Sequence, residues 1–166
     1  MSDCMTKEIN ELALRLSSLL LNQRKTLAVA ESCTGGWLAK SITDLSGSSA
    51  WFLGGVVSYS NSAKQHILGV QQQTIETYGA VSQQVAEEMA CGVQRVFAAN
   101  LAVSVTGIAG PSGGCDEKPV GLVWFAIKGQ SHQELSVRKL FKGGRDQVRL
   151  QSVKTALMLL IEHVAD

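Results

Sequence analysis

A serine placed between a strand and a helix is the first feature of this sequence that could carry covalent chemistry. Ser32 follows an apolar run over 26–30 and opens the segment Ser32-Cys33-Thr34-Gly35-Gly36. A serine at the carboxyl end of a strand can attack a carbonyl carbon, with N–H groups of its own turn holding the oxyanion. In the plainer alternative, Ser32 or Thr34 only caps the helix. The segment is not Gly-x-Ser-x-Gly, so it lacks the elbow signature of α/β hydrolases.

A serine nucleophile needs a base, and Lys64 follows a predicted strand that should end at the same edge of the sheet. A lysine accepts a proton only when it is neutral, which requires burial or a nearby positive charge. Arg145 could supply that charge, whereas Glu31 would oppose the shift if it lay close. The alternative is a solvated lysine on a helix. None of the three histidines belongs to a recognisable triad.

Two glycine-rich segments are suited to an anionic ligand. Thr106 and Gly107 end a predicted strand and lead into a loop over 107–119. Consecutive N–H groups in such a loop can wrap an anion, although a flexible turn is the simpler interpretation. Arg145 follows two glycines and could bind a phosphate or carboxylate. The segments match neither the dinucleotide nor the P-loop pattern, and no metal-ligand spacing occurs, so neither a cofactor nor a metal is expected.

These residues must be positioned by alternating helices and strands. Apolar spacing predicts helices over 6–23, 37–46, 61–68, 83–97 and 146–164. Short apolar runs predict strands over 26–30, 51–59, 101–106, 121–128 and 135–141, the last two as an antiparallel hairpin. The pattern predicts a single α/β domain over residues 1–166, with a mixed β-sheet flanked by helices on both faces.

Length and composition limit the class of protein. The chain has 166 residues, 45% of them hydrophobic and 17% charged, with 15 Lys and Arg against 14 Asp and Glu. It can bury a sizeable core and is too apolar for disorder. Near-neutral charge and 5% aromatic residues offer no surface for nucleic acid. No secretory signal or membrane span is visible, so we expect a cytoplasmic protein with no membrane partner.

Five motifs in this sequence resemble those of the CinA C-terminal domain family. They are Ala30-Glu31-Ser32-Cys33-Thr34-Gly35-Gly36, Gly54-Gly55-Val56-Val57-Ser58-Tyr59-Ser60-Asn61 with Lys64, Tyr78-Gly79-Ala80-Val81-Ser82, Thr106-Gly107-Ile108-Ala109-Gly110-Pro111 and Lys118-Pro119-Val120-Gly121. The motifs span nearly the whole chain, which resembles the stand-alone form of the family. The longer CinA proteins carry an additional molybdopterin-binding-like domain at the amino terminus.

The resemblance implies hydrolysis of the carboxamide of nicotinamide mononucleotide to nicotinate mononucleotide and ammonia, in pyridine nucleotide recycling. It also implies a serine–lysine pair, Ser32 and Lys64, in which neutral Lys64 takes the serine proton. We expect Tyr59 to orient the lysine or to stack on the pyridine ring. The residues expected to hold the oxyanion or the substrate are Cys33, Thr34, Gly35, Gly36, Thr106, Gly107 and Arg145.

Several alternatives stay open from the sequence. Cys33 could replace Ser32 as the nucleophile because thiols ionise more readily, although we expect Cys33 to pack inward. The chain could be a catalytically weak or inactive nucleotide-binding module of the same fold. A role in DNA uptake or repair is suggested only by the family's historical name. Apolar residues on the first and last predicted helices suit either the core or an interface, and we expect a homo-oligomer, a dimer.

Overall fold

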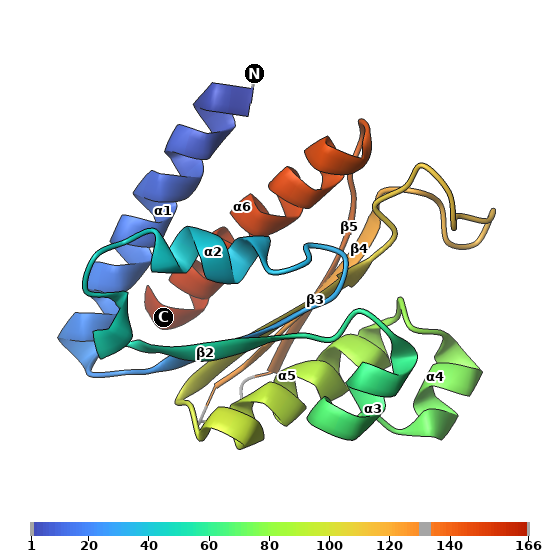
Figure 1. The fold of residues 1–166 in the computed structure, drawn as a ribbon, viewed down its shortest axis with the longest axis horizontal. Coiled ribbons are helices and arrows are strands. Elements are labelled where there is room, and N and C mark those ends of the chain that lie inside the picture. The colour runs from blue at the N-terminus through green and yellow to red at the C-terminus, as the bar shows by residue number, and fades with distance from the viewer. Residues whose placement is uncertain (1, 130–133, 166) are drawn as a thin grey trace.

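Five strands form one sheet in the order β2-β1-β3-β4-β5 (Figure 1). The computed structural model describes residues 2–129 and 134–165. Its strands are β1 (Leu27–Glu31), β2 (Phe52–Val57), β3 (Leu101–Gly107), β4 (Leu122–Lys128) and β5 (Glu134–Leu140). Strand β1 pairs in parallel with β2 and β3, while β4 pairs antiparallel with β3 and β5. The predicted α/β class, mixed sheet and antiparallel hairpin are confirmed.

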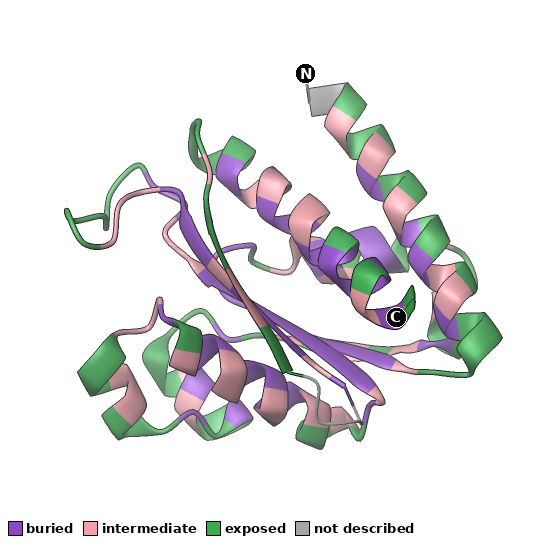
Figure 2. Cartoon of the chain, turned by 180° about the vertical axis from the view of Figure 1, so that it is seen from behind, coloured by how far each residue is buried: buried purple, intermediate pink, exposed green. Residues whose placement is uncertain are grey.

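Helices cover both faces of this sheet, as predicted (Figure 1). One layer consists of α1 (Ser2–Gln23), α2 (Trp37–Thr43) and α6 (Arg145–Ala165), and the other of α3 (Asn61–Leu68), α4 (Gln72–Tyr78) and α5 (Gln83–Phe97). Figure 2 shows the central strands buried between the two layers and exposed residues on the outer sides of the helices. The sheet therefore has an apolar core on each face.

Side-chain alternation along β1 decides which layer each of its residues faces. Val29 belongs to the core cluster shared with α1 and α6, whereas Ala30 belongs to the cluster shared with α3 and α5. Because successive strand residues point to opposite faces, Glu31 continues on the side of Val29 and Ser32 on the side of Ala30. The sheet thus sends Glu31 towards α2 and Ser32 towards α3.

The helix that follows the predicted strand over 51–59 begins and ends as its sequence predicts. The Ser60 hydroxyl accepts a hydrogen bond from the Ala63 N–H and caps α3, and Gly69 closes the helix with a left-handed φ of 72°. Ser82 caps α5 in the same way by accepting from Val85 N–H. Both predicted helix starts are confirmed.

Apart from the shifted ends of α1 and β2, two elements differ from prediction. Helix α2 ends at Thr43, and a short 3-10 helix over Ser48–Ala50 follows it, where a continuous helix over 37–46 was expected. Helix α4 was not predicted, because its residues are mostly polar and none of them is buried. Hydrophobic periodicity finds only helices that bury a face.

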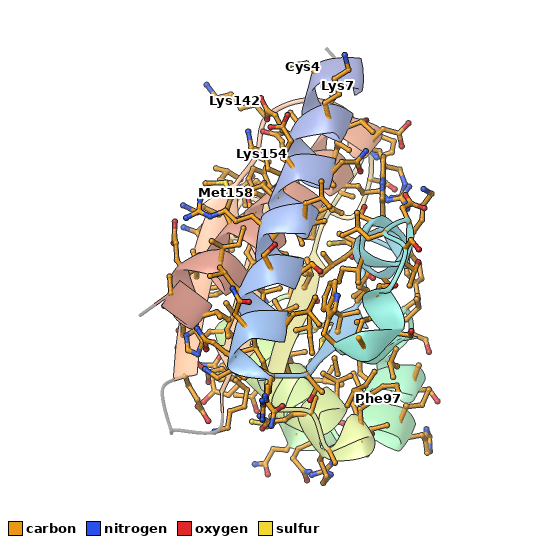
Figure 3. The ribbon with its side chains drawn as sticks, turned by 90° about the vertical axis from the view of Figure 1, so that its left-hand side faces the viewer. Cys4, Lys7, Phe97, Lys142, Lys154 and Met158 are labelled. Carbon is orange, nitrogen blue, oxygen red and sulfur yellow. The ribbon has the colours of Figure 1, made fainter. Side chains whose placement is uncertain are left out.

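Helix α1 packs along α6, and polar residues close the edge of this pairing. Lys154 of α6 forms an ion pair with Glu8 of α1. Figure 3 shows Lys154 and Met158 along the same side of α1. Beneath them Leu16 of α1 and Leu157 of α6 are fully buried. This packing fixes α6, whose first turn lies at the carboxyl edge of the parallel strands.

Candidate active site

Ser32 and Lys64 meet at the carboxyl end of the parallel strands. Lys64 Nζ lies 3.0 Å from Ser32 Oγ and donates a second hydrogen bond, of 2.7 Å, to the Ser58 carbonyl. Lys64 is 1% exposed and Ser32 is 8% exposed. The alternative of a solvated lysine is therefore wrong: the structure brings the two predicted residues into direct contact.

The face of α3 that packs on the sheet carries Lys64 into the interior. Lys64 and Leu68 are the buried residues of this helix and lie one turn apart. Burial lowers the pKa of Lys64 from 10.5 to about 8, and the neighbouring Cys33 acts in the opposite direction. The prediction that Arg145 lowers this pKa is wrong, because Arg145 is exposed and bonds elsewhere.

The carboxylate of Glu31 caps helix α2 from the end of strand β1. It is 1% exposed and accepts hydrogen bonds from the N–H groups of Gly36, Leu38 and Ala39 at 3.1, 3.0 and 2.8 Å. The N-cap residue, Gly36, contributes no side-chain hydrogen bond of its own. The alternative in which Ser32 or Thr34 caps the helix is therefore wrong. The positive end of α2 is satisfied inside the protein by Glu31 rather than left for a ligand.

The backbone N–H groups of the nucleophile turn, Ser32 to Gly36, divide into two sets. Gly35 N–H donates to the Ser32 carbonyl at 3.1 Å, and Gly36 N–H donates to Glu31. The expectation that these two groups hold an oxyanion is therefore corrected. The N–H groups of Cys33 and Thr34 donate to no oxygen of the described residues.

Gly107 places a third N–H group near the serine. In β3 the Val105 carbonyl accepts from Ser32 N–H at 2.9 Å, across the edge that faces β1. Since backbone groups alternate sides along a strand, the Gly107 N–H points to this same edge, beyond the end of β1. The hydroxyl of Thr106 instead donates to the Ala80 carbonyl at 2.8 Å, towards the α5 layer. Of this predicted pair, the backbone of Gly107 is the part that faces Ser32.

Cys33 is directed away from the nucleophile side of the turn. It is 6% exposed and belongs to the core cluster on the α1 and α6 face. Burial raises the pKa of the Cys33 thiol to about 12. The predicted inward packing is confirmed, and a thiol that stays protonated near neutral pH is a poor nucleophile.

Tyr59 and Arg145 form an exposed rim beside the buried pair. Arg145 donates hydrogen bonds to the Tyr59 hydroxyl at 3.0 Å and to the Gly110 carbonyl at 2.8 Å. These bonds join the first turn of α6, the loop after β3 and the segment between β2 and α3. Tyr59 therefore holds Arg145, while the Ser58 carbonyl orients Lys64.

The described residues, 2–129 and 134–165, give no sign of a metal or membrane site. No three His, Cys, Asp or Glu side chains come together among them as metal ligands. Among the helices in these ranges, none has the length and apolar character needed to cross a bilayer.

The family model for the CinA C-terminal domain matches residues 9–164 of this chain. The chain belongs to the CinA C-terminal domain family. Among solved family structures, the competence/damage inducible protein CihA from Agrobacterium tumefaciens is 44% identical, with a TM-score of 0.92 and 96% of both chains covered. The CinA superfamily protein KP700603 from Klebsiella pneumoniae is 36% identical, with a TM-score of 0.91, over 95% of this chain and 98% of its own.

Relatives in the CinA family include proteins named for an enzymatic activity and longer CinA-like proteins. A nicotinamide-nucleotide amidohydrolase PncC from Enterobacter agglomerans is 50% identical over 161 residues, which is 95% of this chain and 98% of that protein. The protein of the same name from Escherichia coli K12 is 48% identical over 153 residues, 92% and 93% of the two chains. A CinA-like protein from Syntrophomonas wolfei is 52% identical over 90% of this chain, a match that covers 36% of that longer protein.

Sequence reasoning missed three contributors to this CinA-family site. Residue type alone indicates Glu31 only as an opposing charge, and it gives no sign of the role of the Ser58 carbonyl. Arg149 was not singled out, yet its Nη2 donates to the Thr34 carbonyl at 3.0 Å. The available signal was its position four residues after Arg145 on a predicted helix, which places both arginines on one face.

Proposed function

We propose that this chain is a nicotinamide-nucleotide amidohydrolase that converts the carboxamide of nicotinamide mononucleotide, with water, into nicotinate mononucleotide and ammonia. The names of relatives 48–50% identical over nearly the full chain support this substrate. The observation that carries the chemistry is the buried 3.0 Å contact between Lys64 Nζ and Ser32 Oγ. A lysine of lowered pKa beside a serine hydroxyl is the arrangement that a serine–lysine hydrolase requires.

The first half of the reaction forms an ester on Ser32. Neutral Lys64 takes the proton of the Ser32 hydroxyl, and Ser32 Oγ attacks the carboxamide carbon. The tetrahedral intermediate then collapses, the carbon–nitrogen bond breaks, and Lys64 returns its proton to the departing ammonia. Burial keeps about a tenth of Lys64 neutral at pH 7, from its pKa of about 8.

The second half of the reaction hydrolyses that ester. Lys64, neutral again, takes a proton from water, and the hydroxide oxygen attacks the acyl carbon. The carbon–oxygen bond to Ser32 breaks, and Lys64 returns the proton to Ser32 Oγ. One water is consumed, and one carboxylic acid and one ammonia are formed; near neutral pH the acid ionises and its proton is taken up by the ammonia as ammonium. The Ser58 carbonyl holds Lys64 Nζ at 2.7 Å throughout, which keeps the amine aimed at the reacting atoms.

Three backbone N–H groups surround Ser32 as oxyanion donors in this proposal. Those of Cys33 and Thr34 donate to no oxygen of the described chain, and that of Gly107 faces the same edge of the sheet. Such fixed donors stabilise the developing negative charge, and removing one commonly lowers kcat by about 10²–10³-fold in other hydrolases.

The phosphate of the nucleotide is assigned to Arg145. The guanidinium is exposed, and its two described hydrogen bonds leave three of its five N–H donors for a ligand. Its bonds to Tyr59 and Gly110 hold it above the loop that follows β3. A single fixed arginine recognises a phosphate without giving the whole protein a basic charge.

An ammonia-release assay with nicotinamide mononucleotide tests the proposal. Ser32→Ala should lower turnover by at least about 10³-fold, because the nucleophile is lost. Lys64→Arg should be equally impaired, because arginine keeps the charge but cannot act as a base. Normal turnover in either correctly folded variant would contradict the assigned roles.

Cys33→Ala is the matched control for Ser32→Ala, since it removes the neighbouring side chain of the same turn. We expect Cys33→Ala to release ammonia within a few-fold of the unmodified protein, because the buried thiol stays protonated. A dead Cys33→Ala that binds substrate normally would make the cysteine the nucleophile. Calorimetric binding of nicotinamide mononucleotide without any ammonia would instead select a binding module.

A further inference from the structure

Arg149 reaches the nucleophile turn from the opposite side to Lys64. Its Nη2 donates to the Thr34 carbonyl at 3.0 Å, and its guanidinium carbon lies 5.2 Å from the centre of the Trp37 ring. Asp146 Oδ1 is 3.8 Å from Nη1, on a side chain that is 86% exposed. The contact with Thr34 and the stack on Trp37 therefore determine where this guanidinium lies.

The turn that Arg149 touches needs an external restraint. Gly35 and Gly36 follow each other with φ values of 62° and 92°, a backbone conformation that is open mainly to glycine. A Cβ on Gly35 would lie 3.3 Å from Arg149 Nη2, so the glycine also permits this close approach. Two adjacent glycines leave a chain flexible unless its carbonyl and N–H groups are tied to rigid neighbours.

The Thr34 carbonyl is the point at which that restraint acts. It accepts one hydrogen bond from Trp37 N–H, at 3.2 Å within the turn, and one from Arg149. Arg149 belongs to α6, a helix of 21 residues anchored against the core. The Thr34 carbonyl shares its peptide plane with the Gly35 N–H, which donates to the Ser32 carbonyl at 3.1 Å. Orienting this carbonyl therefore also fixes the contact of the turn with Ser32.

Lysine would not serve in this place as well as arginine. A guanidinium can lie flat on the indole ring and still donate in its own plane to a carbonyl, whereas an ammonium is a compact point charge. The Nε of Arg149 is buried without an acceptor among the described residues, an arrangement that lowers stability. The guanidinium therefore lies where it contacts the Thr34 carbonyl and the Trp37 ring, although one of its N–H donors has no acceptor among the described residues.

We propose that Arg149 is a positioning residue for Ser32, acting through the Thr34 carbonyl and not through contact with substrate. Arg149 lines a cavity of about 450 Å³ between α1, α2 and α6, on the face of the sheet opposite to α3 and Lys64. Gly35, Gly36 and Trp37 line the same cavity. The back of the nucleophile turn thus lines a space that lies on the opposite face of the sheet from the contact between Ser32 and Lys64.

This geometry makes a specific prediction about chemical rescue. Arg149→Ala should lower kcat by about 10- to 100-fold, the effect of a small misplacement of reacting groups, and leave KM within about threefold. Because the cavity opens to solvent, millimolar guanidinium ion should enter the vacated place, stack on Trp37 and bond the Thr34 carbonyl. It should restore part of kcat, whereas equal concentrations of sodium or tetramethylammonium chloride should not.

The controls separate positioning from folding. Thermal unfolding of each variant shows whether it is folded, and Arg149→Met keeps an apolar stem over Trp37 should the alanine variant fail to fold. Lys154→Ala removes a cation from the same helix, one paired with Glu8, and should leave kcat unchanged. Arg149→Ala with Trp37→Leu should lose the rescue, because the stacking surface is gone.

Because this role rests on the proposed amidohydrolase function, a second readout is independent of the nucleotide. The rate at which a fluorophosphonate labels Ser32 should fall in Arg149→Ala and recover with guanidinium. An unmodified protein that releases no ammonia would overturn the proposed function, while this labelling would still decide the role of Arg149. Full kcat and labelling in Arg149→Ala, or a loss that follows the unfolded fraction without rescue, would overturn the positioning role.

Discussion

The nucleophile side of the site and the rim beside it are built in opposite ways. Glu31, Ser32 and Lys64 are each at most 8% exposed and are joined to neighbouring elements by short hydrogen bonds. On the rim, Tyr59 is 60% exposed and Arg145 is exposed, and one hydrogen bond joins their side chains. The difference lies in the number of restraints on each group and in its distance from water.

The contrast follows from what each side has to do. Proton transfer and oxyanion stabilisation need atoms that are fixed to within a fraction of an ångström in a water-poor environment. A charged nucleotide must enter from solvent, so the groups that bind its phosphate have to stay accessible. Changes on the buried side should therefore alter kcat and stability, and changes on the rim should alter KM alone.

Replacing Lys64 should have the largest effect. Lys64→Met is expected to lower turnover by at least about 10³-fold, because no base remains. The same change should raise the free energy of unfolding at pH 7 by on the order of 1–3 kcal/mol, since a buried ammonium is removed. Chemical denaturation together with the ammonia assay measures both effects, and a Lys64→Met protein less stable than the unmodified one would contradict the second.

The pH dependence tests the same buried lysine. Its pKa is about 8 in the folded protein and 10.5 in the unfolded chain, so between these values the unfolded state binds the extra proton. Stability of the unmodified protein should therefore rise relative to Lys64→Met as pH increases from 8 to 10. For the same reason kcat/KM should rise with pH to a plateau above about 8. A rate that is flat between pH 6 and 9 would remove the lysine from the role of base.

Glu31→Gln should come next in size. The amide can accept through one oxygen only and turns an NH₂ towards backbone N–H donors, so the three bonds to the start of α2 cannot all survive. We expect the free energy of unfolding to fall by about 2–4 kcal/mol and kcat to fall with it. Glu8→Gln, which alters a half-exposed carboxylate paired with Lys154, should change stability by less than about 1 kcal/mol. Equal effects of the two changes would show that Glu31 has no special structural role.

Changes on the rim should affect binding. Arg145→Met is expected to raise KM by about 10- to 100-fold through the loss of a charged hydrogen bond to phosphate, with the melting temperature unchanged. Lys142→Met removes an exposed cation three residues earlier in the chain and should leave KM as it is. If Arg145→Met lowers kcat while KM is unchanged, the phosphate assignment is wrong.

Tyr59→Phe should have the smallest effect of the series. The change removes the hydroxyl that accepts from Arg145 at 3.0 Å, and loss of one exposed hydrogen bond should raise KM by about two- to tenfold. Tyr78→Phe, at another half-exposed tyrosine, should leave the kinetics unchanged. A fall of Tyr59→Phe turnover as large as that of Lys64→Met would place Tyr59 among the groups that act on the reacting atoms.

Much of the site was predictable because its components lie at the ends of strands or in the helix that follows one. Ser32 follows β1, Gly107 ends β3, and Lys64 lies in α3, the helix after β2; parallel strands bring such segments to one edge of a sheet. The capping serines, Ser60 and Ser82, were predictable for a similar reason, since capping depends on residues three positions apart. Features that depend on residues close together in the chain could therefore be predicted.

The predictions that failed concern the surroundings of individual side chains. Residue type indicates Glu31 only as a charge that would oppose the lowering of the Lys64 pKa, yet the alternation of β1 turns its carboxylate towards the N–H groups of α2. The lowered pKa of Lys64 comes from burial and not from Arg145, since that arginine stays at the surface. Burial results from packing over long sequence separations and does not follow from the identity of one residue.

The sequence by itself determined the five strands and the helices that bury an apolar face, the turn that carries Ser32 and the glycines that this turn requires, because these depend on local periodicity and backbone conformation. Only the tertiary structure decided that Lys64 is buried against Ser32, that Glu31 fills the start of α2 and that Arg149 holds Thr34 from 115 residues away along the chain. The physical reason is that desolvation and hydrogen-bond partnership are properties of the packed layers on the two faces of the sheet. Both properties arise only when helices that are distant in the sequence pack against the two faces of the sheet.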